Sequence, residues 1–297
     1  QGEGVWLPQF LALLMKRFSA VSRQIGEEEY ADQLIDTAQK LLQTVEETAW
    51  DGAWYLRAYF DNGEKMGSRE SEECRIDSLT QSFSVLSGMK DKGRQASALQ
   101  EVYEQLVDRE HGLVRLFTPA FQSGSQDPGY VKAYPAGLRE NGGQYTHAAV
   151  WYAMALLQSG NAERGYELIR MLNPAQRYAG DSLWRSYLTE PYYMAADIYT
   201  NPDAYARGGW SVYTGAAGWY YKTITEDLLG IRVRYDRIEL KPCLPREWNG
   251  FSAILKVRGT RIDLKVQHTG TERLTDNGQA ADYIPLDGAE HKVMLEC

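Results

Sequence analysis

Cysteine and histidine are scarce in this sequence. The 297 residues include three cysteines and four histidines. Cys74, Cys243 and Cys297 are far apart, odd in number and lack metal-ligand spacing, so they indicate reduced thiols in a cytoplasmic setting rather than a disulfide framework. No histidine has the H-x-x-H or His/Cys spacing of a zinc site. We therefore expect no structural zinc, and no other metal or cofactor is predicted.

The chain also lacks a long apolar run and a basic region. No stretch reaches the roughly 18 apolar residues that span a bilayer, and the N-terminus has neither the basic nor the apolar segment of a signal peptide. The net charge is −8 with both signs interspersed, so no basic stripe is available for a nucleic-acid backbone. With 43% apolar and 24% charged residues, the composition is that of an ordinary soluble globular protein.

An initiator methionine is missing as well. The chain begins Gln1-Gly-Glu-Gly and enters a helical pattern almost at once. We interpret it as a fragment of a longer protein.

Most of the chain predicts helices. Apolar residues recur at helical spacing in residues 5–25, 27–49, 75–89, 90–107, 146–159, 162–172, 190–198 and 219–229. A hairpin is predicted for residues 50–64, and irregular structure for residues 108–131, 177–188 and 199–212. Consecutive helix pairs with long loops at alternate joints are the pattern of an α/α toroid, with a plain helical bundle as the alternative.

The periodicity changes from 3.6 to 2 after Gly230. Residues 231–240, 253–257, 260–267 and 292–296 alternate between apolar and polar side chains, which predicts strands. The chain is therefore predicted to be mainly α. A helical domain at residues 1–229 is followed by a small antiparallel β domain at residues 230–297.

Two motifs combine glycines, aromatic residues and polar residues unusually densely, at residues 134–147 and 207–219. We interpret them as two loops that converge on one anion and one sugar. In the second motif, Thr214 can cap a helix and Gly215 leaves its first N–H groups uncovered, an arrangement that favours an anion. A capped helix with small residues for close packing is the alternative.

At residues 138–147 (Leu-Arg-Glu-Asn-Gly-Gly-Gln-Tyr-Thr-His) and 208–219 (Gly-Gly-Trp-Ser-Val-Tyr-Thr-Gly-Ala-Ala-Gly-Trp), the sequence resembles glycoside hydrolase family 94, the inverting disaccharide phosphorylases. It is similar in particular to the phosphorylase-like C-terminal region of bacterial cyclic β-1,2-glucan synthases. Shorter matches occur in order over nearly the whole chain, at residues 54–59, 73–82, 127–130, 190–191 and 240–245.

The resemblance implies a partial (α/α)6 toroid followed by a small antiparallel β-sandwich. It also implies that His147 and the pair Thr214 and Gly215 bind phosphate, and that Glu140 contacts sugar hydroxyls. The general acid of the family is an Asp in a short Asp-Trp-Asn-Asp motif. That motif does not occur in residues 1–297, so we expect the acid upstream of Gln1 and no catalytic residue in this chain. The fragment alone is expected to be inactive.

Other polar residues are weaker candidates. Gln144 shares the loop of Glu140 and can bond sugar hydroxyls as donor and acceptor. Arg57 is a candidate for a sugar or phosphate oxygen, with a structural salt bridge as the alternative. Glu73 and Asp77 lie one helical turn apart, where an ion pair with an Arg is more common than catalysis. His147 itself has the alternative of a capping or core histidine.

The sequence therefore predicts part of an inverting glycoside phosphorylase acting on β-glucan, with β-1,2 linkages. Phosphate, the co-substrate, attacks the anomeric carbon and releases glucose 1-phosphate, so no second carboxylate is needed. The alternatives are a hydrolase on the same barrel and a non-catalytic carbohydrate-binding or scaffolding piece.

The expected partners are a β-glucan oligosaccharide, inorganic phosphate and the N-terminal part of the parent chain, and a homodimer is left open. The resemblance implies a cytoplasmic location, with the parent an inner-membrane protein that carries this region on the cytoplasmic side.

Overall fold

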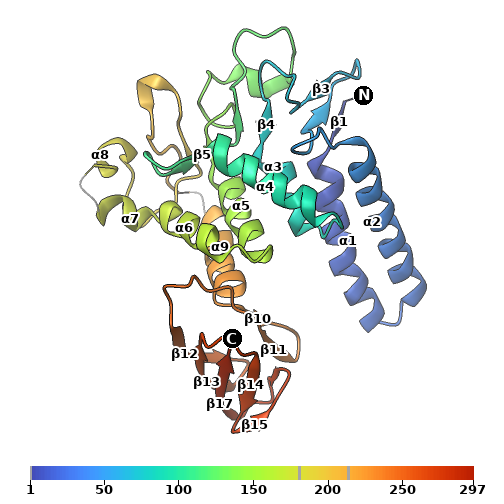
Figure 1. Ribbon diagram of the computed structural model, residues 1–297, viewed down its shortest axis with the longest axis vertical. Helices are drawn as coiled ribbons and strands as arrows, with labels where there is room; N and C mark the ends of the chain where they lie inside the picture. Colours follow the sequence, from blue (N-terminus) through green and yellow to red (C-terminus); the bar gives the residue numbers. More distant parts are fainter. Residues whose placement is uncertain (1, 180–181, 213–214) are drawn as a thin grey trace. The chain divides into compact units, whose positions relative to one another are not determined.

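The structure, a computed structural model, describes residues 2–179, 182–212 and 215–297 (Figure 1). It has two compact units. One comprises Gln1–Ala155 and Arg170–Trp219, and the other Leu156–Ile169 and Tyr220–Cys297. The first is mainly helical and the second contains the long β-strands. A helical part followed by a β part is the order that the sequence predicts.

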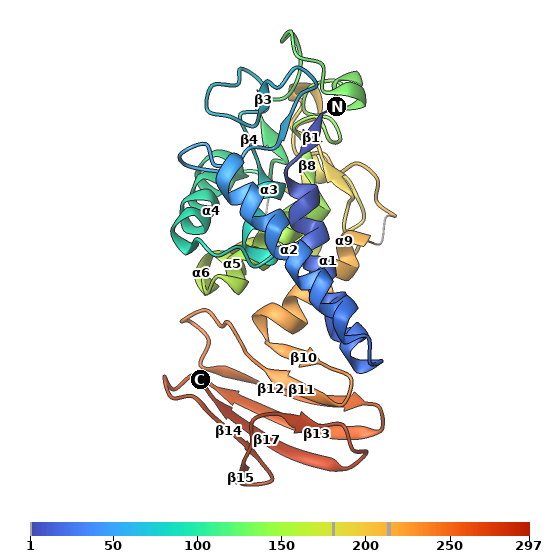
Figure 2. The ribbon, with the colours of Figure 1, turned by 90° about the vertical axis from the view of Figure 1, so that its right-hand side faces the viewer.

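The helices account for most of the regular structure up to residue 230. They are α1 (Trp6–Gln24), α2 (Glu28–Thr48), α3 (Ser78–Leu86), α4 (Lys92–Leu106), α5 (Thr146–Gln158), α6 (Ala162–Leu172), α7 (Pro174–Ala179), α8 (Trp184–Tyr187) and α9 (Gly215–Lys222). Short 3-10 turns occur at Gly129–Ala133 and Pro202–Ala204, and a π-helical turn at Thr223–Leu228 follows α9. The helices α1 and α2 lie side by side (Figures 1 and 2). None of the helices in the described ranges is long and apolar enough to cross a membrane.

The short helix α3 is fully buried, although four of its nine residues are Ser or Thr. Burial is tolerated because the hydroxyls of Ser82 and Ser84 bond within the helix, where Ser82 Oγ donates to Ser78 O at 2.6 Å and Ser84 Oγ to Gln81 O at 2.7 Å. Asp77 caps the helix by accepting the Thr80 N–H at 3.1 Å. Its other oxygen, Oδ2, lies 2.6 Å from Arg57 Nη1. The cap and the ion pair together fix the start of α3.

Two-residue strands hold the loops of the helical unit in place. They pair as β1 (Glu3–Gly4), β2 (Ala58–Tyr59) and β3 (Lys65–Met66); β4 (Ile76–Asp77) with β7 (Phe117–Thr118); β5 (Val107–Asp108) with β6 (Leu113–Val114); and β8 (Gln144–Tyr145) with β9 (Asp197–Ile198). All of these pairings are antiparallel. Part of the predicted loop at residues 108–131 thus forms strands β6 and β7, which pair with β5 and β4.

Two local predictions are wrong. Residues 190–198 were expected to form a helix but form a turn followed by β9. Residues 177–188 were expected to be irregular but contain the end of α7 and all of α8. For residues 190–198 the reason is tertiary: residues 196–198 bond to two neighbouring segments, and these hydrogen bonds override the local apolar spacing.

The α1 helix leaves one apolar face exposed. A row of large side chains at alternating spacings of four and three residues is between 44% and 72% exposed: Leu7, Leu11, Leu14, Phe18, Val21 and, just beyond the helix, Ile25. The buried residues of α1 are small or polar, as at Ala12 and Gln9. Gln9 Nε2 donates to Thr80 O at 3.2 Å and so ties α1 to α3.

The second unit contains two sheets. One has the order β10 (Ile231–Val233), β11 (Arg237–Leu240), β16 (Ile284–Pro285), and the other has the order β12 (Gly250–Val257), β13 (Thr260–Gln267), β17 (Glu290–Glu296), β14 (Arg273–Asp276), β15 (Gln279–Ala280). Alternate residues such as Ile262, Leu264 and Val266 are buried in the core of this unit, as the period of two predicts. Figure 2 shows the strands of the larger sheet lying next to one another.

The expected antiparallel arrangement needs one correction, because β13 and β17 pair in parallel. The other pairings of this unit are antiparallel. Alternation reveals which face of a strand is buried but not the direction of its neighbour. The predicted strand at residues 231–240 is also two strands, β10 and β11, paired as a hairpin.

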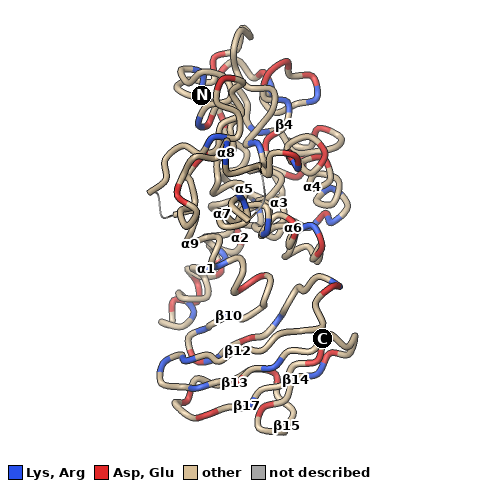
Figure 3. The backbone as a smooth tube through the Cα atoms, turned by 90° about the vertical axis from the view of Figure 1, so that its left-hand side faces the viewer, with Lys and Arg blue, Asp and Glu red and all other residues tan. Residues whose placement is uncertain are grey.

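Positively and negatively charged residues are interspersed along the chain (Figure 3). One cluster in the β unit surrounds the buried His291: its Nδ1 lies 2.6 Å from Asp276 Oδ2, and its Nε2 lies 3.1 Å from Asp287 Oδ1. Burial opposes the charged imidazole, but the hydrogen bonds and charges of the two carboxylates raise the pKa of His291 above its ordinary value.

This cluster predicts a pH-dependent stability. A raised folded-state pKa stabilises the fold fully below the unfolded pKa of about 6.5, and this stabilisation is lost as the pH rises through the folded value. We expect His291→Gln to lower the free energy of unfolding by about 1–2 kcal/mol at pH 5.5, and by less at pH 9. Urea unfolding of both proteins at the two pH values checks this. An equal loss at both pH values would contradict it.

Candidate functional site

The short ladder between β8 and β9 joins the first glycine-rich motif to the segment before the second. Gln144 lies opposite Ile198, and Tyr145 lies opposite Asp197. On the other side of the same segment, Gly209 N–H donates to Asp197 O at 2.8 Å. The segment at residues 196–198 therefore lies between the two motifs and holds both by backbone hydrogen bonds.

The two motifs meet at His147 and Gly215. A Cβ atom built on Gly215 would lie 2.9 Å from His147 Nε2 and closer still to Cε1. The imidazole thus rests against the first residue of α9, where only a glycine leaves room for it. Three residues further on, a Cβ on Gly218 would meet no atom within 4 Å. The close approach is therefore specific to the beginning of the helix.

His147 is half-buried among aromatic rings. Its ring centroid lies 5.6 Å from that of Tyr145 and 5.3 Å from that of Trp151. The Trp151 ring in turn lies 5.6 Å from Trp219 of α9, in an edge-on contact. Within the described residues, the buried Trp151 Nε1 has no hydrogen-bond partner. Burial lowers the pKa of His147 below its ordinary value, so the imidazole is mainly neutral at pH 7 and can donate one N–H.

Next to Tyr145 along the first motif lies a cluster of two carboxylates and one guanidinium. Arg139 Nε lies 3.9 Å from Glu140 Oε2 and 3.8 Å from Asp197 Oδ2. Both of these carboxylate oxygens are buried and lack a hydrogen-bond partner in the described part of the chain. Burial raises the pKa of Asp197, with Glu140 adding to the rise. Burial and the Glu140 charge also raise the pKa of Tyr145. Tyr145 lies opposite Asp197 in the β8–β9 ladder and its ring contacts that of His147, so it connects this cluster to the surroundings of His147.

The buried Asn141 fixes the loop that carries Glu140. Its Nδ2 donates to Phe121 O and Tyr134 O, both at 2.8 Å, and its Oδ1 accepts the Phe121 N–H at 2.8 Å. The following Gly142 has a φ of 84°, and its Cβ would collide with Ala120. Asn141 and Gly142 therefore hold the turn and leave the neighbouring Glu140 to face the site.

Two predicted sugar contacts have structural roles instead. Gln144 is 1% exposed; its Oε1 accepts the Val114 N–H at 2.8 Å and its Nε2 donates to Thr146 Oγ1 at 3.1 Å. Arg57 bonds to Asp77, as described for the cap of α3. This pair is the structural salt bridge that the sequence left open for Arg57.

Several other candidates lie elsewhere. Thr214 lies outside the described residues. Glu73 Oε1 accepts three backbone N–H groups, those of residues 122, 123 and 124, and so anchors that loop. Sequence reasoning did not connect Asp197 or Arg139 with the site. Arg207, the first residue of the second motif, is exposed.

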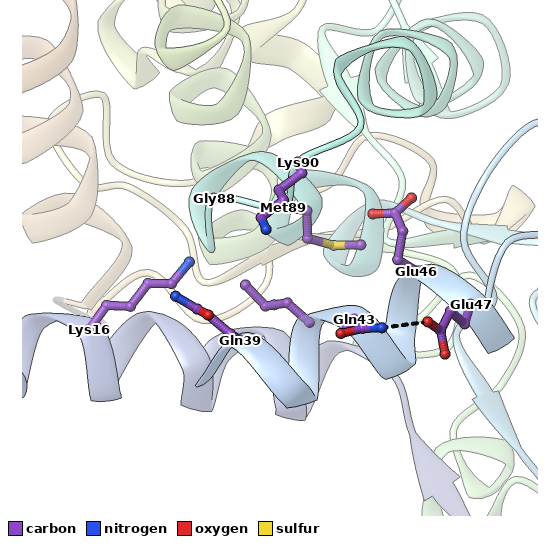
Figure 4. A pocket seen from close by; sticks show the side chains of 9 residues that line it. Lys16, Gln39, Gln43, Glu46, Glu47, Gly88, Met89 and Lys90 are labelled. Atoms are coloured by element: carbon purple, nitrogen blue, oxygen red, sulfur yellow. Dashed lines mark hydrogen bonds between the residues drawn. The ribbon is translucent and has the colours of Figure 1, made fainter. Parts of the chain in front are cut away.

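A separate pocket of about 390 Å³ lies beside α1 and α2 (Figure 4). Its polar lining includes Lys16, Lys90 and Glu46, around the apolar Leu42 and Met89. None of the predicted site residues lines it. In the described part of the chain, no three His, Cys, Asp or Glu side chains are grouped as metal ligands.

Two family models match this chain. Residues 1–230 match the model of the glycosyl hydrolase 94 superfamily, catalytic domain. The chain belongs to this superfamily. Residues 231–293 match a second model, that of the glycosyl hydrolase family 65, C-terminal domain. The resemblance inferred from the two motifs is thereby confirmed.

Similar members of the glycosyl hydrolase 94 superfamily are sugar-transferring enzymes. The chain is 45% identical over 266 residues to cyclic beta-(1,2)-glucan synthase NdvB of Rhizobium meliloti, which covers 90% of this chain and 9% of that protein. It is 29% identical over 309 residues to solabiose phosphorylase of Paenibacillus borealis, covering 100% of this chain and 39% of the relative. With N,N'-diacetylchitobiose phosphorylase of Vibrio furnissii the identity is 28%, covering 95% of this chain and 36% of the relative. The chain thus spans well under half the length of these relatives.

Solved structures share the fold at low identity. A sialidase matches with a TM-score of 0.56 and 14% identity, over 84% of this chain and 22% of that one. The GH78 family rhamnosidase of Bacillus sp. GL1 also matches with a TM-score of 0.56 and 14% identity, over 99% of this chain and 27% of that one. These likenesses concern the fold alone.

The contact between Gly215 and His147 leads to a prediction for the NMR titration of His147, with a matched control variant. Gly215→Ala must displace the imidazole, whereas Gly218→Ala in the same helix has open space. We expect the His147 C–H resonances in NMR to titrate below about pH 6.5 in the native protein. The midpoint of this titration should move towards about pH 6.5 in Gly215→Ala and remain unchanged in Gly218→Ala. Identical titrations in all three proteins would rule out the contact.

Proposed function

We propose that this chain forms the phosphate- and sugar-binding part of an inverting glycoside phosphorylase that acts on a β-linked glucan. The observation that carries the proposal is the packing of the His147 imidazole against Gly215 at the beginning of α9. A helix N-terminus presents uncovered N–H groups and the positive end of the helix dipole. Together with a ring N–H of the imidazole, these groups suit a phosphate dianion.

In the proposed reaction, a phosphate oxygen forms a bond to the anomeric carbon while the bond from that carbon to the glycosidic oxygen breaks. The leaving oxygen takes a proton from a general acid, which we place in the preceding part of the parent protein. Attack from the opposite face inverts a β-linkage to α-glucose 1-phosphate. His147 and the α9 N-terminus orient the nucleophile. The buried Glu140 Oε2, which has no hydrogen-bond partner in the described residues, accepts a sugar hydroxyl.

Three finer points belong to the same proposal. The helical unit is part of an (α/α)6 toroid, consistent with consecutive helix pairs such as α1 with α2. The linkage is β-1,2, in keeping with the 45% identity to a cyclic beta-(1,2)-glucan synthase. The location is cytoplasmic, in keeping with the free thiols of all three cysteines.

The central test is phosphate dependence. With β-1,2-glucan as substrate, the parent protein should release glucose 1-phosphate only when phosphate is present. Release of free glucose without phosphate would instead favour the hydrolase, and glucan binding without turnover would favour a non-catalytic carbohydrate-binding piece.

Removing the imidazole should abolish most of this activity. We expect His147→Ala in the parent protein to lower kcat/KM for phosphorolysis about 100- to 1,000-fold, the cost of losing one positioned donor at a developing charge. Initial rates at varied phosphate measure the effect, and Gly218→Ala should remain near the native value. Undiminished phosphorolysis in His147→Ala would refute the role of this residue.

Phosphate should also change the protonation of His147. Burial lowers its pKa in the free protein, whereas a bound anion favours the imidazolium. Saturating phosphate should therefore raise the pKa of His147 by about one unit or more, the size of shift that a close opposite charge causes. NMR titration with and without phosphate checks this, with the other three histidines as internal controls. A His147 pKa that does not respond would place the anion elsewhere.

A further inference from the structure

The pocket beside α1 and α2 combines two lysines with an apolar centre. Its volume is about 390 Å³, and its lining includes Lys16 of α1, Gln39 and Leu42 of α2, and Met89 and Lys90 of the loop between α3 and α4. The ends of the Lys16 and Lys90 side chains point toward one another, and the Gln39 amide lies at the same end of the pocket (Figure 4). We call this cavity the lysine pocket. It shares no lining residue with the candidate site.

The two lysines are not neutralised by a carboxylate. Neither forms an ion pair within the described ranges, and the Lys90 side chain has no hydrogen bond there either. Lys16 Nζ donates to Ser87 O at 2.8 Å, which uses one of its three N–H groups. Burial and the charge of Lys90 lower the pKa of Lys16. The lysine end of the pocket therefore has an excess of positive charge and unused hydrogen-bond donors.

The carboxylates at the other end of the pocket have partners of their own. Glu46 Oε1 lies 3.0 Å from Arg94 Nη1 and accepts a hydrogen bond from the Tyr55 hydroxyl at 2.8 Å. Glu47 is exposed, and its Oε1 accepts a hydrogen bond from Gln43 Nε2 at 2.7 Å (Figure 4). Glu46 and Glu47 therefore do not compete with an external anion for the two lysines.

The apolar centre of the lysine pocket is held in place by two buried glutamines. Gln9 Nε2 donates to Met89 Sδ at 3.3 Å, and Gln95 Nε2 donates to Met89 O at 2.7 Å. These bonds fix the loop that carries Met89, which lines the pocket together with Leu42 of α2. A preformed apolar surface beside two unpaired cations suits a ligand with an anionic head and an apolar body.

We propose that the lysine pocket binds a small organic anion. Its negative head lies between Lys16 and Lys90, and its aliphatic body packs on Leu42 and Met89. The head is a carboxylate or a phosphate monoester, because both accept strong hydrogen bonds from ammonium groups. Small-molecule pockets in proteins have volumes of about 300–1,000 Å³, so the cavity is large enough for such a ligand. This inference concerns a second site and does not depend on the proposed function.

The test compares ligands that have one chain length and different charges. Hexanoate, hexyl phosphate and hexylammonium are titrated into the parent protein by calorimetry at low ionic strength, where charge interactions are least screened. We expect the two anions to bind about tenfold more tightly than hexylammonium, because the lysine end attracts negative charge and repels positive charge. The tighter of the two anions identifies the preferred head. Equal binding of hexanoate and hexylammonium, or no binding of either anion, would overturn the proposal.

Three variants determine whether the anions bind in the lysine pocket. Lys90→Met should weaken anion binding about fivefold, equivalent to the ~1 kcal/mol of an exposed ion pair, and should leave the fold intact because the Lys90 side chain makes no hydrogen bond or ion pair in the described residues. Lys90→Arg keeps the charge and should bind anions nearly as well as the native protein. Lys40→Met is the matched control, since Lys40 is exposed on α2 and does not line the pocket. Equal affinities in Lys90→Met and Lys40→Met would place the anion elsewhere and refute the site.

Acetylation of Lys16 supplies an independent measurement. The unprotonated amine reacts with acetic anhydride, and mass spectrometry of peptides follows the rate at each lysine. Saturating hexanoate should slow the acetylation of Lys16, because a bound anion favours the unreactive ammonium form, and should leave the rate at the exposed Lys40 unchanged. A Lys16 rate that hexanoate does not alter would contradict the proposed position of the anionic head.

Discussion

The pairing of β8 with β9 is the constraint on which the candidate site depends. Tyr145 and Asp197 are far apart in the sequence, and closing so long a loop is entropically costly. A ladder of two residues on each strand forms too few backbone hydrogen bonds to offset that entropic cost alone. The buried amides of Asn141 and Gln144 contribute the additional hydrogen bonds that fix the first motif. The geometry of the site thus depends on side chains that are themselves buried.

The fold could be predicted in outline from periodicity, because burying one face of a helix or strand leaves a repeat in the sequence. Helices α1, α2 and α4 and the strand β13 lie close to the predicted ranges. Periodicity failed where tertiary hydrogen bonds decide the backbone, as at residues 190–198, and where strand direction is set by the path of the chain, as for β17 beside β13.

The candidate site could be predicted only in part. Glycine density indicated that the two motifs converge, and the family resemblance implied that His147 and Gly215 share one site. The close approach of the imidazole to Gly215 demands a residue without a side chain. Arg139 and Asp197 gave no comparable signal, since an ion pair between distant residues leaves no local pattern. Gln144 was misassigned for the converse reason: an amide that can bond a sugar can equally bond the backbone.

The ion pairs around Arg139 also determine the charge of this part of the site. Arg139 forms ion pairs with both Glu140 and Asp197. Its single positive charge is balanced when one of these carboxylates is ionised, and the negative charge is larger when both are ionised. An anion near Glu140 and Asp197 therefore finds no electrostatic attraction, and only the imidazole and the helix terminus favour it. In the proposed function, this charge balance keeps inorganic phosphate from competing with the sugar for the place beside Glu140.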